Sequence, residues 1–450
     1  MKKMLTTAVT AIVGLSLLAG CGGQSQQPAA TGGASTTATP QQKITLKVYH
    51  YALDKRGEML NADIKKFESE HPNVTVESTV LVPGGSSLDN LKKLDVLTAS
   101  GNDVDVVMMP NSDEVLARAA GGVLAPLDEF YTKNNVKPEE DYFVNPKYKG
   151  KTYAAMDTLS SWYVLLNQNA FEEAGVPLPK EDWTWDDFRD IAKKLTKGEG
   201  ADKRYGAYFH SWGEYANPVA YTDFKNPYLK EDGTLQFTDP SYKYFFNLRR
   251  AMEKEDKSAR PYADVVGAKL NYTSEFANGK AAMLLTGSWT ISSMADTVKN
   301  PHTFKVAFAP IPRSSKTAEF GLSYLNGDYW AAANSSKHKT EAFELIRYLT
   351  TKGNINRGLP GYKKADGKAA ILNVIGDKAN LFNVDSLVQA VYDKRLKTAG
   401  ASEVNISYGS QLKKVVEDGF SKFILDGGSF EDTQKMMLDE GKKIMDQNKK

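Results

Sequence analysis

The sequence is almost without cysteine and contains little histidine. Of its 450 residues, one is a cysteine, Cys21, and five are histidines. A disulfide within the chain is therefore excluded. The histidines are scattered, with no HExxH motif and no pair four residues apart, so a zinc site has little support. We expect no metal and no cofactor.

An excess of charge of either sign is also missing. The chain has 57 Lys and Arg against 55 Asp and Glu, a formal net charge of +2. Removal of Lys2 and Lys3 would bring that charge to zero. Such a balance argues against nucleic acid or broad anionic surfaces as partners.

Motifs for bond-making chemistry are incomplete. Gly150, Lys151 and Thr152 read like the end of a phosphate-binding loop, but Asn145 stands where that loop needs a glycine. The stretch GLSYL at 321–325 begins like a nucleophile elbow, yet it ends in leucine where a glycine should close the turn. The sequence therefore predicts no enzyme active site.

A short apolar run from Met4 to Gly20 follows Lys2 and Lys3 and ends at Cys21. A permanent membrane span needs about 20 predominantly apolar residues, so the run is typical of a removed secretory signal. Its end, LAGC, resembles a bacterial lipoprotein signal, in which the cysteine is lipidated and becomes the first residue. The alternative is a chance cysteine in an ordinary signal. We expect a lipoprotein signal peptide over 1–20 and anchoring at the extracytoplasmic face of a bacterial, Gram-positive cell membrane.

The segment 21–42 has no aromatic and no charged residue after Cys21; it consists of Gly, Ser, Thr, Gln, Ala and Pro. Such a composition cannot bury a core and is typical of a flexible spacer, with a root-mean-square reach of roughly 25 Å. The sequence thus predicts a body tethered to a membrane surface through a linker.

The body from Lys43 onward is too long for one ordinary core and suggests two domains. β-Rich segments at 43–51 and 73–84 alternate with helical patterns at 58–70 and 87–100, and a buried apolar strand follows at 103–110. Alternation of this kind predicts an α/β fold with a covered parallel sheet. Beyond Thr184, which looks like a helix N-cap, helices dominate.

Ligands of open α/β sheets bind at the carboxyl ends of strands. The residues placed there are Tyr51 after the first strand, and Asn111 and Asp113 after the strand that ends MMP. They are candidate ligand contacts. For Asp113 the alternative is a charge in the first turn of a helix.

Four tryptophans stand beside small or polar residues: Trp162, Trp212, Trp289 and Trp330. A sugar offers a flat C–H face and hydroxyls at its edge, so aromatic rings next to carboxylates and amides favour a carbohydrate site. Core packing is the alternative for each ring.

The stretch EFANGKAAMLLTGSWTI, Glu275 to Ile291, resembles the central signature of the extracellular solute-binding proteins of ABC importers, in the carbohydrate-binding, maltose-binding-protein-like family. Further segments follow in the order of that family: YKGKTYAAMDTLSSWYVLLNQNAFEEAGV, PLPKEDWTWDDF, KVAFAPIP and HKTEAFELIRYLT. The resemblance covers Lys43 to about Gln447.

The resemblance implies a type II periplasmic-binding-protein-like fold, with two α/β lobes and a ligand cleft between them. It implies hinge crossings near Ala155–Trp162, near Phe308–Arg313 and after Tyr362. The N-terminal lobe would comprise 43–157 and 309–361, and the C-terminal lobe 158–308 and 362–450. Closure around the ligand would create the form that the transmembrane permease subunits recognise, and the protein would act as a monomer.

Carried over by residue, the resemblance marks Trp289 as a sugar-stacking ring and Asp157 as a cleft carboxylate. It also marks the loop with Trp212, Glu214 and Tyr215. Many relatives have a proline in the turn YAAMD, which this sequence lacks.

Two later loops supply weaker candidates. Asp328 lies in SYLNGDYW, Ser323 to Trp330, for which a hairpin turn at Asn-Gly is the alternative. Tyr362 lies in GLPGYKK at 358–364.

Two other functions remain open from the sequence. One is a lipid-anchored carbohydrate hydrolase, which would need two carboxylates about 5 to 10 Å apart in a cleft. The other is a binding protein for peptides or another polar solute, whose cleft would be richer in arginine and poorer in stacked rings.

Overall fold

The computed structural model describes residues 43–448 apart from 53, 85, 320–322, 354–356, 393–397 and 400–405. The expected signal peptide at 1–20, Cys21 and the linker at 21–42 lie outside the described residues. Residues 43–450 form one compact unit by themselves. Within the part described, no helix combines the length and the apolar character needed to cross a membrane.

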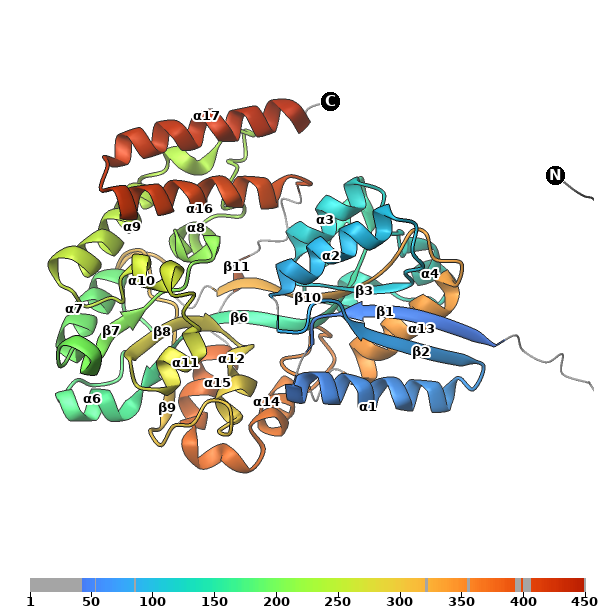
Figure 1. The fold of residues 1–450 in the computed structure, drawn as a ribbon, viewed down its shortest axis with the longest axis horizontal. Helices are drawn as coiled ribbons and strands as arrows, with labels where there is room; N and C mark the ends of the chain where they lie inside the picture. Colours follow the sequence, from blue (N-terminus) through green and yellow to red (C-terminus); the bar gives the residue numbers. More distant parts are fainter. Residues whose placement is uncertain are drawn as a thin grey trace, which may run out of the picture. The chain divides into compact units, whose positions relative to one another are not determined.

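Strands and helices alternate at the start of this unit, as the sequence predicts. The elements are β1 (Ile44–His50), α1 (Asp54–Glu70), β2 (Val74–Val80), α2 (Ser87–Ala99), β3 (Val106–Met109), α3 (Ser112–Ala120), α4 (Asp128–Lys133), α5 (Pro138–Asp141), β4 (Lys147–Tyr148) and β5 (Lys151–Thr152). β1 pairs in parallel with β2 and β3. In Figure 1, α2 and α3 lie on one side of these strands and α1 lies on the other.

The central part of the chain contains β6 (Ala155–Asn167), α6 (Gln168–Ala174), α7 (Trp185–Leu195), β7 (Tyr205–Tyr208), a 3₁₀ turn η2 (Gly213–Tyr215), α8 (Pro218–Asp223), α9 (Pro240–Arg250), a π-helical turn η4 (Ala251–Glu255), α10 (Tyr262–Gly267), α11 (Tyr272–Ala277), β8 (Ala281–Gly287), α12 (Thr290–Ala295) and β9 (Val306–Pro310). Thr184 caps α7 in a capping box with Asp187, which confirms the predicted N-cap.

The last part comprises β10 (Ser323–Ala332), α13 (Lys339–Tyr348), a second π-helical turn η5 (Leu349–Gly353), α14 (Gly367–Ile375), a 3₁₀ turn η7 (Gly376–Leu381), α15 (Val384–Tyr392), β11 (Thr398–Ala399), α16 (Gly409–Asp426) and α17 (Phe430–Asn448). α16 and α17 pack along each other, as Figure 1 shows.

The buried side chains gather around two ends of one sheet. The strand order is β2-β1-β3-β10-β6-β8-β7, with β9 also paired to β6. One core contains the side chains of β1, β3, α1, α3 and α13, and we call the elements around it the first lobe. Two further cores contain the side chains of β7, β8, β9, α7, α14 and α16, and we call these elements the second lobe.

β6 and β10 are the long strands that connect the lobes. Ala155 and Met156 at the start of β6 belong to the core of the first lobe, whereas Val164 and Leu166 near its end belong to the second. β10 lies antiparallel to β6 and then to β3. The first expected crossing, Ala155–Trp162, therefore lies on β6.

The second expected crossing, Phe308–Arg313, lies elsewhere in the structure. Ala309 and Ile311 are buried in a core of the second lobe, and Arg313 donates its backbone N–H to Trp183 there. The chain instead passes between the lobes along β10. The difference arises because β9 pairs with the second half of β6 before the chain turns back.

The alternative of a hairpin turn at Asn326-Gly327 is wrong. Gly327 lies inside β10 and pairs with Leu159 of β6. A Cβ at Gly327 would lie 1.8 Å from the Thr158 carbonyl oxygen, so the glycine permits a close approach of two strands and not a turn.

Candidate functional site

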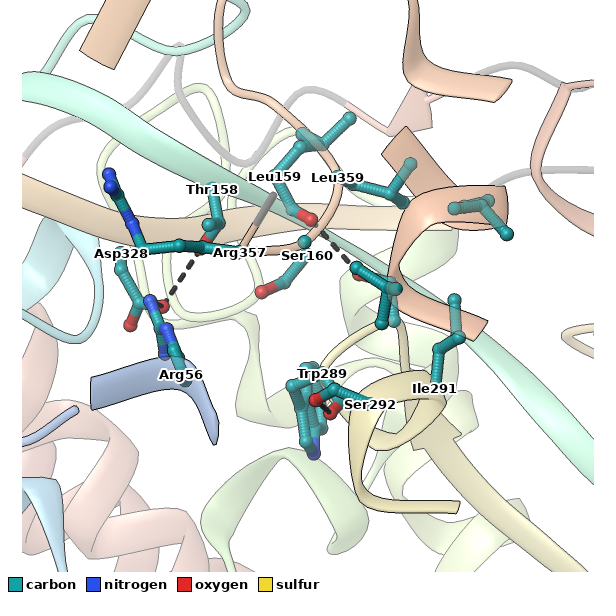
Figure 2. Close-up of a pocket in the computed structure, with 14 residues that line it drawn as sticks. Arg56, Thr158, Leu159, Ser160, Trp289, Ile291, Ser292, Asp328, Arg357 and Leu359 are labelled. Carbon is teal, nitrogen blue, oxygen red and sulfur yellow. Dashed lines mark hydrogen bonds and ion pairs between the residues drawn. The ribbon is translucent and has the colours of Figure 1, made fainter. Parts of the chain in front are cut away.

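A small cavity lies beside β6 where this strand passes between the lobes. Its volume is about 50 Å³. Figure 2 shows Arg56, Thr158 and Asp328 on one side and Trp289, Ile291 and Ser292 on another. The lining comes from α1, β6, β10, α12 and α14, from the turn between β8 and α12, and from the segment 357–359: Arg56, Thr158, Leu159, Ser160, Ser288, Trp289, Ile291, Ser292, Asp328, Arg357, Gly358, Leu359, Ile371 and Val374.

Asp328 organises the polar side of the cavity. Its carboxylate accepts hydrogen bonds from the Tyr51 hydroxyl, from Nη2 of Arg56 at 2.5 Å and from Oγ1 of Thr158 at 2.8 Å. Burial, followed by the charge of Asp328, raises the pKa of Tyr51 well above its usual value. Tyr51 is therefore a protonated donor at neutral pH. Two predicted residues, Tyr51 and Asp328, are brought together here.

A second layer of charges lies behind Asp328. Arg357 donates to Asp157 at 2.5 Å, to Asp63 and to the Leu349 carbonyl at 2.9 Å. Arg56 is 3.6 Å from Asp157. The Asp157 side chain is 0% exposed, so Asp157 is a buried support for the two arginines. The structure thus places Asp157 behind the cavity lining, and its contact with a ligand stays a prediction.

Trp289 forms the aromatic side of the cavity. It is the second residue after the end of β8, and its Nε1 donates to the Tyr272 hydroxyl at 3.1 Å. A Cβ at Gly287 would lie 2.2 Å from the indole ring, so this glycine allows the ring to fold back over the strand end. The short GSW sequence therefore places one indole face at the cavity.

Further rings surround Trp289. The centroid of Trp162 is 5.2 Å from that of Trp289 at an interplanar angle of 79°, and the centroid of Trp212 is 6.1 Å away. Trp212 is 39% exposed, whereas Trp162 and Tyr215 are buried and in edge contact with each other. Trp162 and Tyr215 thus support the exposed ring from behind, and their own contact with a ligand stays a prediction.

Two other candidates lie away from this cavity. Trp330 is 0% exposed in the core of the first lobe, so the core-packing alternative is correct for this ring. Tyr362 packs against Tyr142 of the same lobe, with ring centroids 6.2 Å apart. Sheet pairing explains the position of Trp330, because β10 lies between β3 and β6 and Trp330 pairs with Met108 on one side and Ala155 on the other.

The remaining candidates lie where α3 meets α16. Asn111 caps α3 and accepts from the Glu114 N–H at 2.9 Å. Asp113 is in the first turn of α3, as its alternative reading states, and its carboxylate also faces Gly409 at the start of α16. Glu214 forms an ion pair of 3.1 Å with Lys413 of α16.

The pKa of the Asp113 carboxyl is raised by this environment to about 6. Burial is the main cause, and Lys413 acts in the opposite direction. Asp113 is thus a charged group at neutral pH whose ionisation the surroundings disfavour.

Sequence reasoning missed several residues of these sites: Arg56, Thr158, Tyr272, Arg357 and Lys413. Arg56 follows Tyr51 within the same strand-end region, and position alone could have marked it. Arg357 and Lys413 have no local signal, because their partners are about 200 residues away in the chain. Among the described residues, no group of three His, Cys, Asp or Glu side chains is arranged to hold a metal ion.

Solved structures with the same fold come from several bacteria. The ABC substrate-binding protein Lmo0181 of Listeria monocytogenes, in complex with cycloalternan, has a TM-score of 0.73 at 21% identity, covering 90% of this chain and 99% of its own. UgpB of Mycobacterium tuberculosis, in complex with glycerophosphocholine, has a TM-score of 0.69 at 20% identity, with 90% and 98% covered. These likenesses confirm the two-lobed α/β fold.

Comparison of the sequence with known proteins also finds bacterial solute-binding proteins. The sn-glycerol-3-phosphate-binding periplasmic protein UgpB of Escherichia coli O1:K1 is 21% identical over 336 residues, which is 72% of this chain and 74% of that protein. The family model described as bacterial extracellular solute-binding protein matches residues 53–355, about two thirds of the chain. The chain therefore belongs to the family of bacterial extracellular solute-binding proteins.

Proposed function

We propose that the protein is the substrate-binding subunit of an ABC importer and that it captures a neutral, hydroxylated solute, a sugar or short oligosaccharide. The observation that carries this proposal is the cavity with Trp289 on one side and the hydrogen-bonded pair of Asp328 and Arg56 on the other. An indole face suits the C–H face of a sugar ring, and planar charged groups suit its hydroxyls. Trp212 would extend the aromatic surface for a longer ligand.

The charges near the cavity favour a neutral ligand. Arg56 and Arg357 supply two positive charges, while Asp63, Asp157 and Asp328 supply three negative ones, and each arginine already contacts a carboxylate. An anion would therefore meet arginines that are already neutralised. A neutral sugar can bond to the outer edges of Asp328 and Arg56 without breaking these pairs.

The size of the cavity supports binding by lobe movement. A volume of about 50 Å³ holds a few water molecules and is well below the several hundred Å³ of typical ligand pockets. Trp289 belongs to the second lobe, Arg56 belongs to the first, and Asp328 lies on the connecting strand β10. A sugar would enter when the lobes separate and would then be held by groups of both.

Membrane anchoring and the partner are part of the proposal. The lipoprotein-like sequence around Cys21 supports attachment to the extracytoplasmic face of the membrane through a lipid, and the family supports delivery of the solute to permease subunits. The lobe boundaries near residues 157, 308 and 361 are also part of the proposal.

A phosphate ester is the second candidate ligand. Two arginines line the cavity, and relatives from Escherichia coli and Mycobacterium tuberculosis are named for, or bound to, glycerophosphate compounds. Sugar hydrolysis is disfavoured because Asp157 is fully buried, so that Asp328 is the only carboxylate among the described side chains that line the cavity.

A ligand screen tests the proposal. Thermal unfolding and tryptophan fluorescence are measured with mono- and oligosaccharides, glycerol 3-phosphate and glycerophosphocholine, and each sugar is afterwards analysed for cleavage. A ligand that binds only the native protein raises its melting temperature. A rise with an intact sugar supports the proposal. A rise with the phosphate esters alone, or with shortened sugars, contradicts it.

A further inference from the structure

A cluster of charged side chains joins the two lobes outside the cavity. Lys413, near the start of α16, forms an ion pair with Glu214 of η2 and interacts electrostatically with Asp113 of α3. α16 and η2 pack in the second lobe, whereas α3 packs in the first. Glu214 therefore stays beside Lys413 whatever the lobes do, but Asp113 stays there only while the lobes touch.

Two glycines permit the close approach. A Cβ at Gly409, the first residue of α16, would lie 2.9 Å from Oδ1 of Asp113. A Cβ at Gly213 would lie 2.7 Å from Cγ of Lys413. The stem of Lys413 thus lies across the turn that begins directly after Trp212. The contact between the lobes and the position of Trp212 share one side chain.

We propose that Lys413 is a positioning residue that holds α3 of the first lobe against α16 of the second through Asp113, while it fixes the Trp212 turn through Glu214. The proposal concerns the movement of the lobes and does not depend on which solute binds.

The neighbouring charges make Lys413 the cation on which Asp113 relies. Of the other carboxylates that face the cluster, Glu114 of α3 pairs with Arg118 at 2.5 Å, and Glu417 of α16 interacts with Lys414 and Lys413. Tyr329 of β10 lies close to Asp113 as well, and burial keeps its hydroxyl neutral by raising its pKa. Lys413 is thus a cation and Tyr329 an uncharged donor, and the acids supply the negative charge.

The cluster gives the lobe contact a defined pH dependence. The lobe contact buries Asp113, and burial raises the pKa of its carboxyl to about 6. A raised pKa means that the contact is favoured when Asp113 is protonated, so the contact strengthens as pH falls through about 6. Lys413 offsets part of the cost of the buried carboxylate at higher pH. Loss of Lys413 should therefore matter at pH 7.5 and much less at pH 5.

The test measures the separation of the lobes in the full-length chain without added solute. Spin labels are attached at Lys133→Cys of α4 and Lys254→Cys of η4, both exposed, in a Cys21→Ser background, and their distance distribution is recorded by electron double resonance. Lys413→Met should raise the ratio of long to short distances about fivefold or more at pH 7.5 and should lose most of that effect at pH 5. The matched control is Lys422→Met, an exposed lysine farther along α16, which should change neither distribution.

Two results would overturn the proposal: a distribution for Lys413→Met that equals that of Lys422→Met at pH 7.5, or an increase that is as large at pH 5 as at pH 7.5, which a merely structural defect would give. Should Lys413→Met fail to fold, Asp113→Asn provides the second variant. Its neutral amide should keep the distances short and unchanged between pH 5 and 7.5, whereas the parent lengthens with rising pH. A parent whose distances do not respond to pH would contradict the proposal.

Discussion

The two places where charged groups meet between the lobes are built differently. At the cavity, the partners of Asp328, namely Tyr51, Arg56 and Thr158, come from the first lobe or from the connecting strand β6. At the α3–α16 contact, Asp113 comes from one lobe and Lys413 from the other. The first arrangement persists when the lobes separate, and the second does not. The cavity is therefore suited to recognising a solute, and the contact to controlling closure.

The largest expected effect is the loss of stability when the charge layer behind the cavity is broken. Arg357→Met would leave Asp63 and Asp157 buried without their shared cation, and removal of one partner from a buried pair costs about 3 to 5 kcal/mol. Urea unfolding should show this loss. Lys352→Met, which breaks an exposed pair with Glu70, should cost about 1 kcal/mol or less. Equal losses for both variants would show that the layer does not stabilise the first lobe.

The next effect concerns the aromatic side of the cavity. Trp289→Ala should weaken binding of the solute found in the screen about 100-fold, a loss typical of a buried aromatic anchor. Trp212→Ala should weaken it less, about tenfold, because that ring is 39% exposed and is not among the side chains that line the cavity. Calorimetric titration measures both. A larger loss at Trp212 than at Trp289 would place the main binding surface outside the cavity.

A third substitution tests whether the polar side of the cavity binds the solute. Asp328→Asn keeps the size of the side chain but removes the charge that Arg56 and Tyr51 bind, and we expect a roughly 10- to 100-fold loss of affinity for a neutral sugar. The control is Asp113→Asn, an equivalent substitution outside the cavity, which should change affinity much less at pH 5. Tighter binding of glycerol 3-phosphate by Asp328→Asn would show that the carboxylate excludes anions.

The smallest expected effect is a pH dependence of stability. The raised pKa of Asp113 means that its contribution to stability is fully present below pH about 4 and is lost as the pH rises through about 6. The parent should therefore lose unfolding free energy relative to Asp113→Asn as the pH rises from 4 to 7.

The parent must be compared with Asp113→Asn because His50 changes the stability of both with pH in the opposite direction. Burial, followed by the charge of Arg56, lowers the pKa of His50 to about 4, so its contribution is present at neutral pH and is lost as the pH falls from about 6.5 toward 4. This change is common to both proteins and cancels. A difference that stays constant from pH 4 to 7 would contradict the assignment to Asp113.

The sequence predicts the parts of this structure that local pattern controls. Alternating strands and helices gave the α/β fold, the capping box at Thr184 gave the start of α7, and the small residues before Trp289 gave an indole at a strand end. Each of these depends on neighbours within a few residues, where periodicity and capping act directly.

The misses depend on contacts that are remote in the chain. Asn326 and Gly327 look like a turn locally, but Gly327 serves a close approach to Thr158 of β6. Trp330 and Trp289 have similar polar neighbours in sequence, yet sheet pairing buries one and not the other. Arg357 and Lys413 acquire their roles only through partners on other elements.

The most direct test of the account is a competition for the cavity. Saturation-transfer NMR is recorded on one mixture of neutral mono- and oligosaccharides with glycerophosphocholine, first with the parent protein and then with Trp289→Ala. The account predicts saturation of the C–H protons of a sugar in the parent and loss of that signal in the variant. Saturation of glycerophosphocholine instead, or a sugar signal that is unchanged in Trp289→Ala, would contradict it.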